Sequence, residues 1–241
     1  MLKEIKNGKD LPTHVAVIMD GNRRFAKQLG LEDSSGHIKG KDKLEEMLKW
    51  CTEVGIEILT VYAFSTENFK RDSEEVKHLM DLFNENFKKA AEDERVHENK
   101  IRIKAIGDIE RFPEEVRKSI KYAEEKTEDY NNYYFNMAVG YGGREEIVQA
   151  IKKIAKDVKE DKLDIGDIDE EVFAQRLYTS DFPDPDLILR TSGEERISNF
   201  LLWQSAYSEL YFTDVYWPGF RKIDFLRAIR SYQNRHRRLG E

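Results

Sequence analysis

Short apolar runs recur along the chain, and most end at a cluster of Gly, Asp, Asn or other polar residues. Runs of this length with such borders are typical of buried β-strands. They predict strands over residues 15–19, 56–64, 101–106, 133–139, 186–189 and 210–212.

Between these runs, apolar residues recur at the spacing of an amphipathic helix. One stripe follows Ser73 and consists of Val76, Leu79, Met80, Phe83 and Phe87. The pattern predicts helices over residues 37–54, 144–158, 170–177 and 223–237, and helices that begin near residues 73 and 113.

Strands that alternate with helices indicate an α/β fold. We therefore expect a largely parallel central sheet of about six strands, flanked by helices. No repeat or linker divides the sequence, so we expect a single domain over residues 1–241. Open α/β sheets bind ligands at the carboxyl ends of their strands. Asp20, Ser65, Gly140 and Arg190 follow or end predicted strands, and we expect them to converge on one site.

Composition narrows the class of ligand. The chain has 47 acidic and 40 basic residues, a net charge of −7. This balance argues against nucleic acid as a partner, which usually requires a basic face. It leaves room for a local basic pocket that binds a phosphorylated small molecule.

The single cysteine, Cys51, excludes an intrachain disulfide and a cysteine-based zinc cluster. The sequence shows no apolar signal segment and no run long enough to span a bilayer. We expect a cytoplasmic protein, and contact with a membrane surface stays open.

Residues 20–24, Asp-Gly-Asn-Arg-Arg, combine a carboxylate with two cations at a strand end. One or two carboxylates plus phosphate oxygens suit Mg²⁺, and Arg24 can bind phosphate through two N–H groups. On its own, Asp-Gly is also typical of a plain turn. On such a turn, no core contact is expected to depend on Asp20.

Other polar clusters have two readings each. Residues 62–71 and 190–199 suit a ligand with a charged head, but they also fit ordinary capping and solvated loops. His37 follows Gly36 at a helix start, which attracts anions, although an isolated histidine is more often structural. Glu209 lies in a stretch rich in aromatic residues. It is either a binding-site ligand or a charged residue at the rim of the core.

In this order, the clusters resemble the undecaprenyl diphosphate synthase family of cis-prenyltransferases. The matching segments cover nearly the whole chain: residues 14–24, 36–37, 63–69, 107–108, 141–144, 189–194, 196–204 and 209–212. The resemblance implies Mg²⁺-dependent, sequential condensation of isopentenyl diphosphate onto an allylic starter, farnesyl or geranylgeranyl diphosphate. The product implied is a long-chain polyprenyl diphosphate of the undecaprenyl type, a precursor of glycosyl carrier lipid. An apolar tunnel and a homodimer are implied as well.

The resemblance also implies residue roles. Asp20 and Glu209 would bind Mg²⁺, and Asn68 would serve proton removal, beside Phe69 and Arg71. The allylic substrate would contact Gly21, Asn22, Arg23, Arg24, Phe25 and His37, with Ser65, Thr66 and Glu67 in the same pocket. Isopentenyl diphosphate would contact Arg190, Arg196, Ile197 and Ser198. Arg238-Leu239-Gly240 would reach the neighbouring subunit's site.

Two features complicate this picture. A neutral amide such as that of Asn68 is a poor general base, so it would only position the proton. Asp33 stands where the family often has arginine, which predicts that Asp33 turns outward and that a longer starter is preferred.

Three other classes fit less well. A non-catalytic subunit of this fold would lack Asp20. An oxidoreductase would need the G-x-G-x-x-G spacing, which residues 140–143 do not have. A phosphatase with an Asp nucleophile would need a second aspartate two positions after Asp20.

Overall fold

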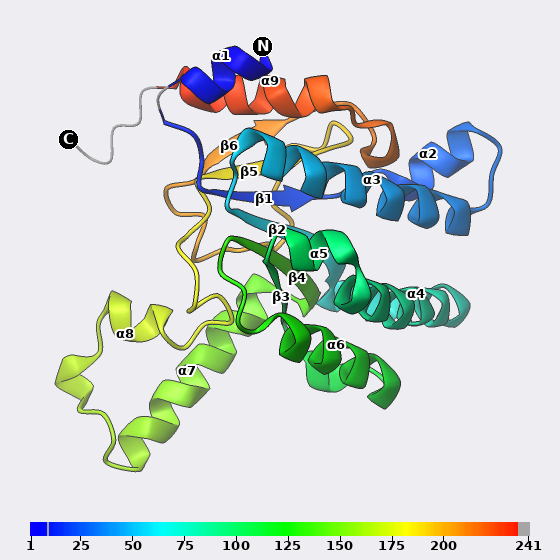
Figure 1. Cartoon of the computed structure of the whole chain (residues 1–241). Helices are drawn as coiled ribbons and strands as arrows, with labels where there is room; N and C mark the ends of the chain where they lie inside the picture. Colours follow the sequence, from blue (N-terminus) through cyan, green and yellow to red (C-terminus); the bar gives the residue numbers. More distant parts are fainter. Residues whose placement is uncertain (9, 236–241) are drawn as a thin grey trace.

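The computed structural model describes residues 1–8 and 10–235, and its centre is a six-stranded parallel sheet (Figure 1). The strand order is β3-β4-β2-β1-β5-β6. The strands are β1 (His14–Ile18), β2 (Ile58–Ser65), β3 (Ile101–Ile106), β4 (Tyr133–Tyr141), β5 (Leu187–Arg190) and β6 (Glu209–Phe212). This arrangement confirms the predicted fold class. A single domain over residues 1–241 stays a prediction.

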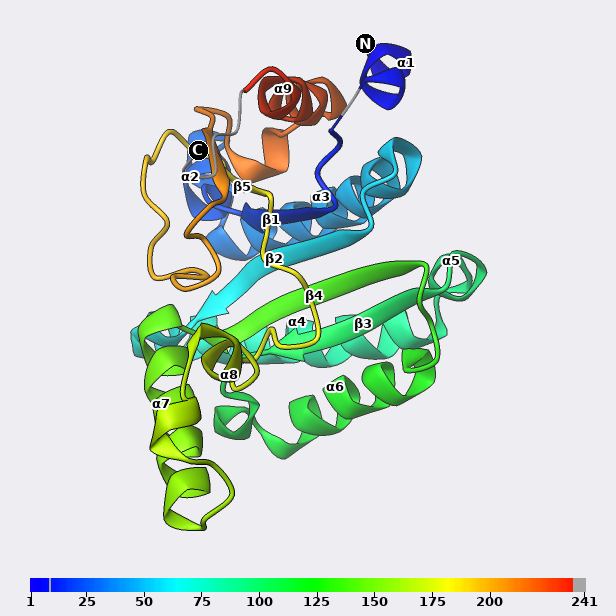
Figure 2. The same cartoon turned by 90° about the vertical axis from the view of Figure 1, so that its left-hand side faces the viewer.

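Helices pack mainly on one face of the sheet, and a segment that carries Phe200 and Leu201 packs on the other (Figures 1 and 2). The longer helices are α3 (Asp33–Val54), α4 (Ser73–Glu92), α6 (Glu114–Thr127), α7 (Gly143–Lys159) and α9 (Lys222–Gln233). Shorter helices are α1 (Leu2–Asn7), α2 (Asn22–Gln28), α5 (Glu94–Glu98) and α8 (Glu170–Ala174). In Figure 1, α7 and α8 project from the body as an arm.

The core has two parts because alternate side chains of a strand point to opposite faces. In β1, Val15 and Val17 join the large cluster under α3, α4, α6 and α9. Ala16 and Ile18 join a smaller cluster on the other face, with Phe200 and Leu201. Burial on both faces explains why β1 is a continuous apolar run.

The helix starts differ most from the sequence-based expectation. Helix α2 begins inside the polar cluster, directly after Gly21, whose φ of 102° lies in the left-handed region. Helix α3 begins at Asp33, four residues before the expected start. These turns carry polar residues that contact the site, so they lack the apolar periodicity that reveals a helix. Across the described residues, no helix is both long enough and apolar enough to cross a membrane.

Candidate active site

The predicted polar residues meet at the carboxyl edge of the sheet. Because β1, β2, β4 and β5 are parallel, the segments after Ile18, Ser65, Tyr141 and Arg190 leave from the same edge. Asp20, Ser65 and Arg190 therefore lie on one side of the molecule, as expected.

Asp20 is held by two arginines. Arg190 Nη2 donates to Asp20 Oδ2 at 2.8 Å, and Arg24 Nη2 donates to Oδ1 at 3.1 Å. Burial disfavours the charged carboxylate, but the hydrogen bonds and charges of Arg190 and then Arg24 outweigh it and lower the pKa of Asp20. The Arg190 side chain is only 5% exposed. The expectation that no core contact depends on Asp20 is therefore wrong.

The loop after β5 is built around Arg190. Arg190 Nη1 donates to Ser198 Oγ at 2.6 Å and to the Arg196 carbonyl. Ser192, Ser198 and Asn199 have positive φ angles of 83°, 48° and 64°. Such conformations are unfavourable for residues other than glycine and often mark functional sites. The loop holds polar groups around the guanidinium at the expense of backbone strain.

Arg24 and Arg196 share a carboxylate in that loop. Glu194 accepts from Arg24 Nη1 at 3.0 Å and from Arg196 Nη1 at 2.5 Å. Arg24 also donates to Ser192 Oγ at 2.7 Å. The two predicted substrate contacts, one for each diphosphate, are thus joined through Glu194.

The segment after β2 is fixed by its own cap. Asn68 Oδ1 accepts the backbone N–H of Ser65 at 2.9 Å, and the Ser65 side chain reciprocates. The predicted proton-handling amide is therefore immobilised at one end. Asn199 Nδ2 lies 3.3 Å from Glu67 Oε1, which joins this segment to the loop after β5.

Phe69 has a structural role in this segment. Its ring packs edge-on against Phe64 and Phe112, and the Arg111 guanidinium lies 4.2 Å from its centroid.

Thr66 Oγ1 and Asn199 Nδ2 lie so close to Gly142 that a side chain there would collide with them. The close approach of these loops requires glycine.

A second group of basic side chains surrounds Glu75. Arg71 Nη1 lies 2.8 Å from Glu75 Oε1, Arg23 Nη1 lies 3.3 Å from Oε2, and His37 Nε2 lies 3.5 Å from Oε1. Burial is the main cause that lowers the pKa of His37. Burial opposes the charge on Glu75, but Arg71 and Arg23 outweigh it and lower the pKa of Glu75.

Sequence reasoning missed Glu75 and Glu194 as site residues. In the sequence, Glu75 indicates only an acidic residue in the first turn of a helix, where such residues are common. Its position four residues after Arg71, in the first turn of α4, was the available signal, because opposite charges this close in the sequence can pair.

Three buried polar atoms at this edge have no hydrogen-bond partner among the residues that the structure describes: Asn22 Oδ1, His37 Nε2 and Arg190 Nε. Buried polar groups are usually satisfied. His37 Nε2 and Arg190 Nε are nitrogen atoms that can carry an N–H donor. An anionic ligand at this edge could accept from them.

The remaining predicted residues lie near these groups. A side chain at Gly21 would meet Ser192 and Tyr216, so the turn after β1 packs tightly on the loop after β5. Phe25 is half-buried, and Ile197 packs on the smaller core cluster. The Arg238-Leu239-Gly240 tail lies outside the described residues.

The donor set suits Mg²⁺ only together with a diphosphate. Within the described part of the chain, no group of three His, Cys, Asp or Glu side chains is placed to hold a metal. Mg²⁺ commonly uses one or two carboxylates and completes its shell with phosphate oxygens and water. Asp20, beside Arg24 and Arg190, fits that chemistry.

Glu209 does not join Asp20 within this chain. It is the first residue of β6 and pairs in register with Leu187, whereas the site lies beyond Arg190. That separation is roughly 10 Å along the strand direction alone. Glu209 instead forms an ion pair with Arg235, the last described residue.

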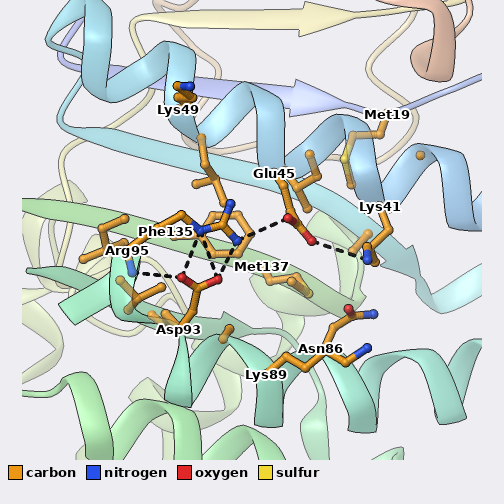
Figure 3. Close-up of a pocket in the computed structure, with 18 of the residues that line it drawn as sticks. Met19, Lys41, Glu45, Lys49, Asn86, Lys89, Asp93, Arg95, Phe135 and Met137 are labelled. Atoms are coloured by element: carbon orange, nitrogen blue, oxygen red, sulfur yellow. Dashed lines mark hydrogen bonds and ion pairs between the residues drawn. The ribbon is translucent and has the colours of Figure 1, made fainter. Parts of the chain in front are cut away.

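An apolar cavity of about 560 Å³ opens next to the cations. Two residues of the site, Asn22 and His37, line one end of the cavity. From there the cavity continues between α3, α4 and the sheet. Figure 3 shows several of the lining side chains, among them Met19, Phe135 and Met137. The other apolar lining residues include Leu44, Leu48, Leu79, Leu82, Phe83 and Ile103. A charged edge thus adjoins an apolar cavity.

The comparisons with known proteins agree with this geometry. Residues 18–240 match the family model described as putative undecaprenyl diphosphate synthase. The chain belongs to the undecaprenyl diphosphate synthase family of cis-prenyltransferases. It is therefore a prenyltransferase, which confirms the resemblance and the predicted enzyme class.

Relatives in this family cover the chain from end to end. The tritrans,polycis-undecaprenyl-diphosphate synthase (geranylgeranyl-diphosphate specific) of Picrophilus torridus is 58% identical over all of this chain and 94% of its own. The enzyme of the same name from Methanocaldococcus jannaschii is 54% identical over all of this chain and 87% of its own.

Solved structures share the cis-prenyltransferase fold. Lavandulyl diphosphate synthase from Lavandula x intermedia, in complex with dimethylallyl diphosphate, has a TM-score of 0.92 and 40% identity. The alignment covers 96% of this chain and 99% of that one. A probable undecaprenyl diphosphate synthase from Campylobacter jejuni has a TM-score of 0.78 and 37% identity, with 97% and 100% covered.

Proposed function

We propose that this cis-prenyltransferase condenses isopentenyl diphosphate repeatedly onto geranylgeranyl diphosphate, with Mg²⁺, to form undecaprenyl diphosphate. One observation carries the proposal. Asn22 and His37 belong both to the polar edge, where the arginines gather, and to the end of the apolar cavity. A ligand that fits has a diphosphate head joined directly to a long apolar tail.

The arginines of the site divide into two groups. Arg23, Arg71 and His37 surround Glu75, and His37 also lines the cavity; these three would bind the diphosphate of the starter. Arg190 and Arg196, with Ser198, would bind isopentenyl diphosphate. Arg24 lies between the groups, because it contacts both Asp20 and Glu194.

The reaction breaks the bond between the allylic carbon and its diphosphate, and the double bond of isopentenyl diphosphate attacks that carbon. Cations stabilise the negative charge that develops on the leaving group. Mg²⁺, held by Asp20 and phosphate oxygens, would neutralise further charge there. Ionised Asp20 suits that role at neutral pH because its pKa is lowered.

Asn68 would orient the proton that is lost. Its Oδ1 accepts the N–H of Ser65, which fixes the amide plane and leaves the Nδ2 end to face substrate. An amide is a poor base, so a diphosphate oxygen or water takes the proton.

The choice of starter rests on relatives and on Asp33. The relatives from Picrophilus torridus and Methanocaldococcus jannaschii are named geranylgeranyl-diphosphate specific. Here Asp33 is 55% exposed, and its Oδ2 lies 3.9 Å from Arg23 Nε. A carboxylate at this place competes with the diphosphate for Arg23, and burial of a longer tail offsets that loss at about 0.8 kcal/mol per CH₂.

A homodimer belongs to the proposal. Strand β6 lies at the end of the sheet order, and exposed apolar residues lie nearby or on the projecting arm: Tyr207 is 78% exposed, Ile151 53% and Val148 48%. Exposed apolar groups of this kind often mark protein interfaces. In a dimer, Glu209 would serve the partner's metal rather than Asp20 of its own chain. We place the enzyme in the cytoplasm, in contact with a membrane through its lipid product.

Labelled isopentenyl diphosphate tests the proposal. The purified protein is incubated with geranyl, farnesyl or geranylgeranyl diphosphate, with Mg²⁺ or with EDTA, and products are separated by chain length. We expect long products with Mg²⁺ only and the highest kcat/KM for geranylgeranyl diphosphate. Equal product with EDTA, or a preference for geranyl diphosphate, would refute it.

A further inference from the structure

The apolar cavity lies between helices that do not pack on each other. Helix α3 makes its main contacts with α2 and the 3₁₀ segment at Trp217–Gly219, not with α4. Among the described residues, two contacts between a basic and an acidic side chain link α3 to the α4–α5 segment. One is His37–Glu75 at the charged end, and the other is Glu45–Arg95.

The Glu45–Arg95 pair lies well away from the charged end. Glu45 follows His37 by eight positions on α3, about 12 Å along the helix axis. Arg95 is in α5, after the whole of α4, whose first turn carries Glu75. Both residues line the cavity, and Figure 3 shows the pair as part of a chain of contacts that crosses it.

A long product cannot stay within this cavity. The lining of α3 extends from His37 to Glu53, about 24 Å. At roughly 1.25 Å of extended chain per bond, about 16 main-chain carbons of a geranylgeranyl tail need about 20 Å and fit. The main chain of an undecaprenyl tail, about 44 carbons, needs about 55 Å. The tail must therefore leave the cavity while it grows.

The Glu45–Arg95 pair can open without leaving a charge unpaired. Arg95 Nε also donates to Asp93 Oδ1 at 2.9 Å, and Asp93 is fixed because it caps α5. Glu45 Oε1 lies 3.4 Å from Lys41 Nζ one turn earlier. When the pair separates, Arg95 keeps Asp93 and Glu45 keeps Lys41.

The Glu45–Arg95 pair costs little to open. Arg95 is 65% exposed and Glu45 is 45% exposed. Exposed ion pairs contribute only about 0–1 kcal/mol, so a tail that outgrows the cavity meets little resistance here. The His37–Glu75 pair differs, because its side chains are only 12% and 18% exposed.

We infer that Glu45 and Arg95 form a gate through which the growing polyprenyl tail leaves the cavity, and that these two residues help to determine product length. This inference rests on the proposed function. A gate that cannot open confines the tail, so growth stops at the length that fits the cavity.

A reversible cross-link tests the gate. Glu45→Cys and Arg95→Cys are combined and joined by a short bis-thiosulfonate that a reductant cleaves. Cys51 is the chain's single cysteine and is buried, so the reagent meets the two new thiols. Matched controls are Glu45→Cys alone and the pair Glu114→Cys with Lys118→Cys on exposed α6, whose native side chains also form an ion pair.

The readout is the distribution of product lengths, which does not depend on how much enzyme is active. We expect the cross-linked protein to stop after a few condensations, the reduced protein to make long products, and both controls to make long products throughout. Arg95→Ala, without a cross-link, should shift the distribution toward longer chains.

Two results from the cross-linked protein would overturn the gate: unchanged long products, or no condensation at all, which would place the pair at the entrance. An unchanged distribution in Arg95→Ala would count against it in the same way. If the wild type itself made no polyprenyl product, the proposed function would fail instead.

Discussion

Replacing Asp20 with asparagine separates its catalytic role from its structural one. The substitution removes one charge and keeps an oxygen that can accept from Arg190. Arg190 also keeps the Ser198 hydroxyl and the Arg196 carbonyl as acceptors. Hydrogen bonds to charged groups contribute about 1.5–3 kcal/mol each. Because the Asp20 side chain is 28% exposed and Arg190 stays partly satisfied, we expect a loss of about 1–2 kcal/mol of unfolding free energy.

Turnover should fall much further than stability. Loss of a metal ligand and of the charge beside a leaving diphosphate should cost several kcal/mol in the transition state. A loss of about 4 kcal/mol corresponds to roughly a thousandfold lower kcat/KM. The assays are isopentenyl diphosphate incorporation at saturating Mg²⁺ and thermal unfolding, where about 2–4 °C is lost per kcal/mol for a chain of this size.

The pH dependence provides an independent check. The pKa of Asp20 is lowered in the folded protein, so its stabilising contribution is present above the ordinary pKa near 3.9 and is lost as pH falls through the folded value. The stability difference between wild type and Asp20→Asn should thus be constant near neutral pH and shrink below about pH 4. The matched control is Asp181→Asn, which removes an exposed ion pair with Lys104 far from the site. Activity within tenfold of wild type, or a control that loses as much, would refute the reasoning.

Three further changes have defined outcomes. Asp33→Arg should raise kcat/KM most for geranyl diphosphate, since it removes the competitor for Arg23; an equal change for all starters would contradict this. Asn68→Ala should lower turnover. Because it also removes the cap on the Ser65 N–H, it should cost about 1 kcal/mol of unfolding free energy; an unchanged unfolding free energy would show that the cap does not stabilise the fold. Val148→Asp, on the exposed face of α7, should shift sedimentation from dimer to monomer; a dimer that persists would exclude this surface from the interface.

The sheet and the edge that carries the site follow from local sequence patterns. Apolar runs mark buried strands, and in a parallel sheet the residues after them share one edge, which is why Asp20, Ser65 and Arg190 could be grouped. Helix α2 could not be predicted because its residues serve the site and carry no apolar period.

Long-range pairing accounts for what the sequence did not reveal. Glu75 shows its role only when Arg23, Arg71 and His37 are brought around it by separate segments. The position of Glu209 depends on the register of β6 against β5, which no local pattern specifies. The Glu45–Arg95 contact spans 50 positions of the chain and depends on how far α3 and α5 stand apart.

The geometry of the newly formed double bond tests the central claim most directly. The purified protein is given geranylgeranyl diphosphate and a single equivalent of labelled isopentenyl diphosphate, and the product of one condensation is analysed by NMR after removal of its diphosphate. The proposed function predicts a cis double bond in the added unit, in line with the polycis products for which the relatives are named. A trans double bond, or no carbon–carbon bond formed at all, would contradict the account.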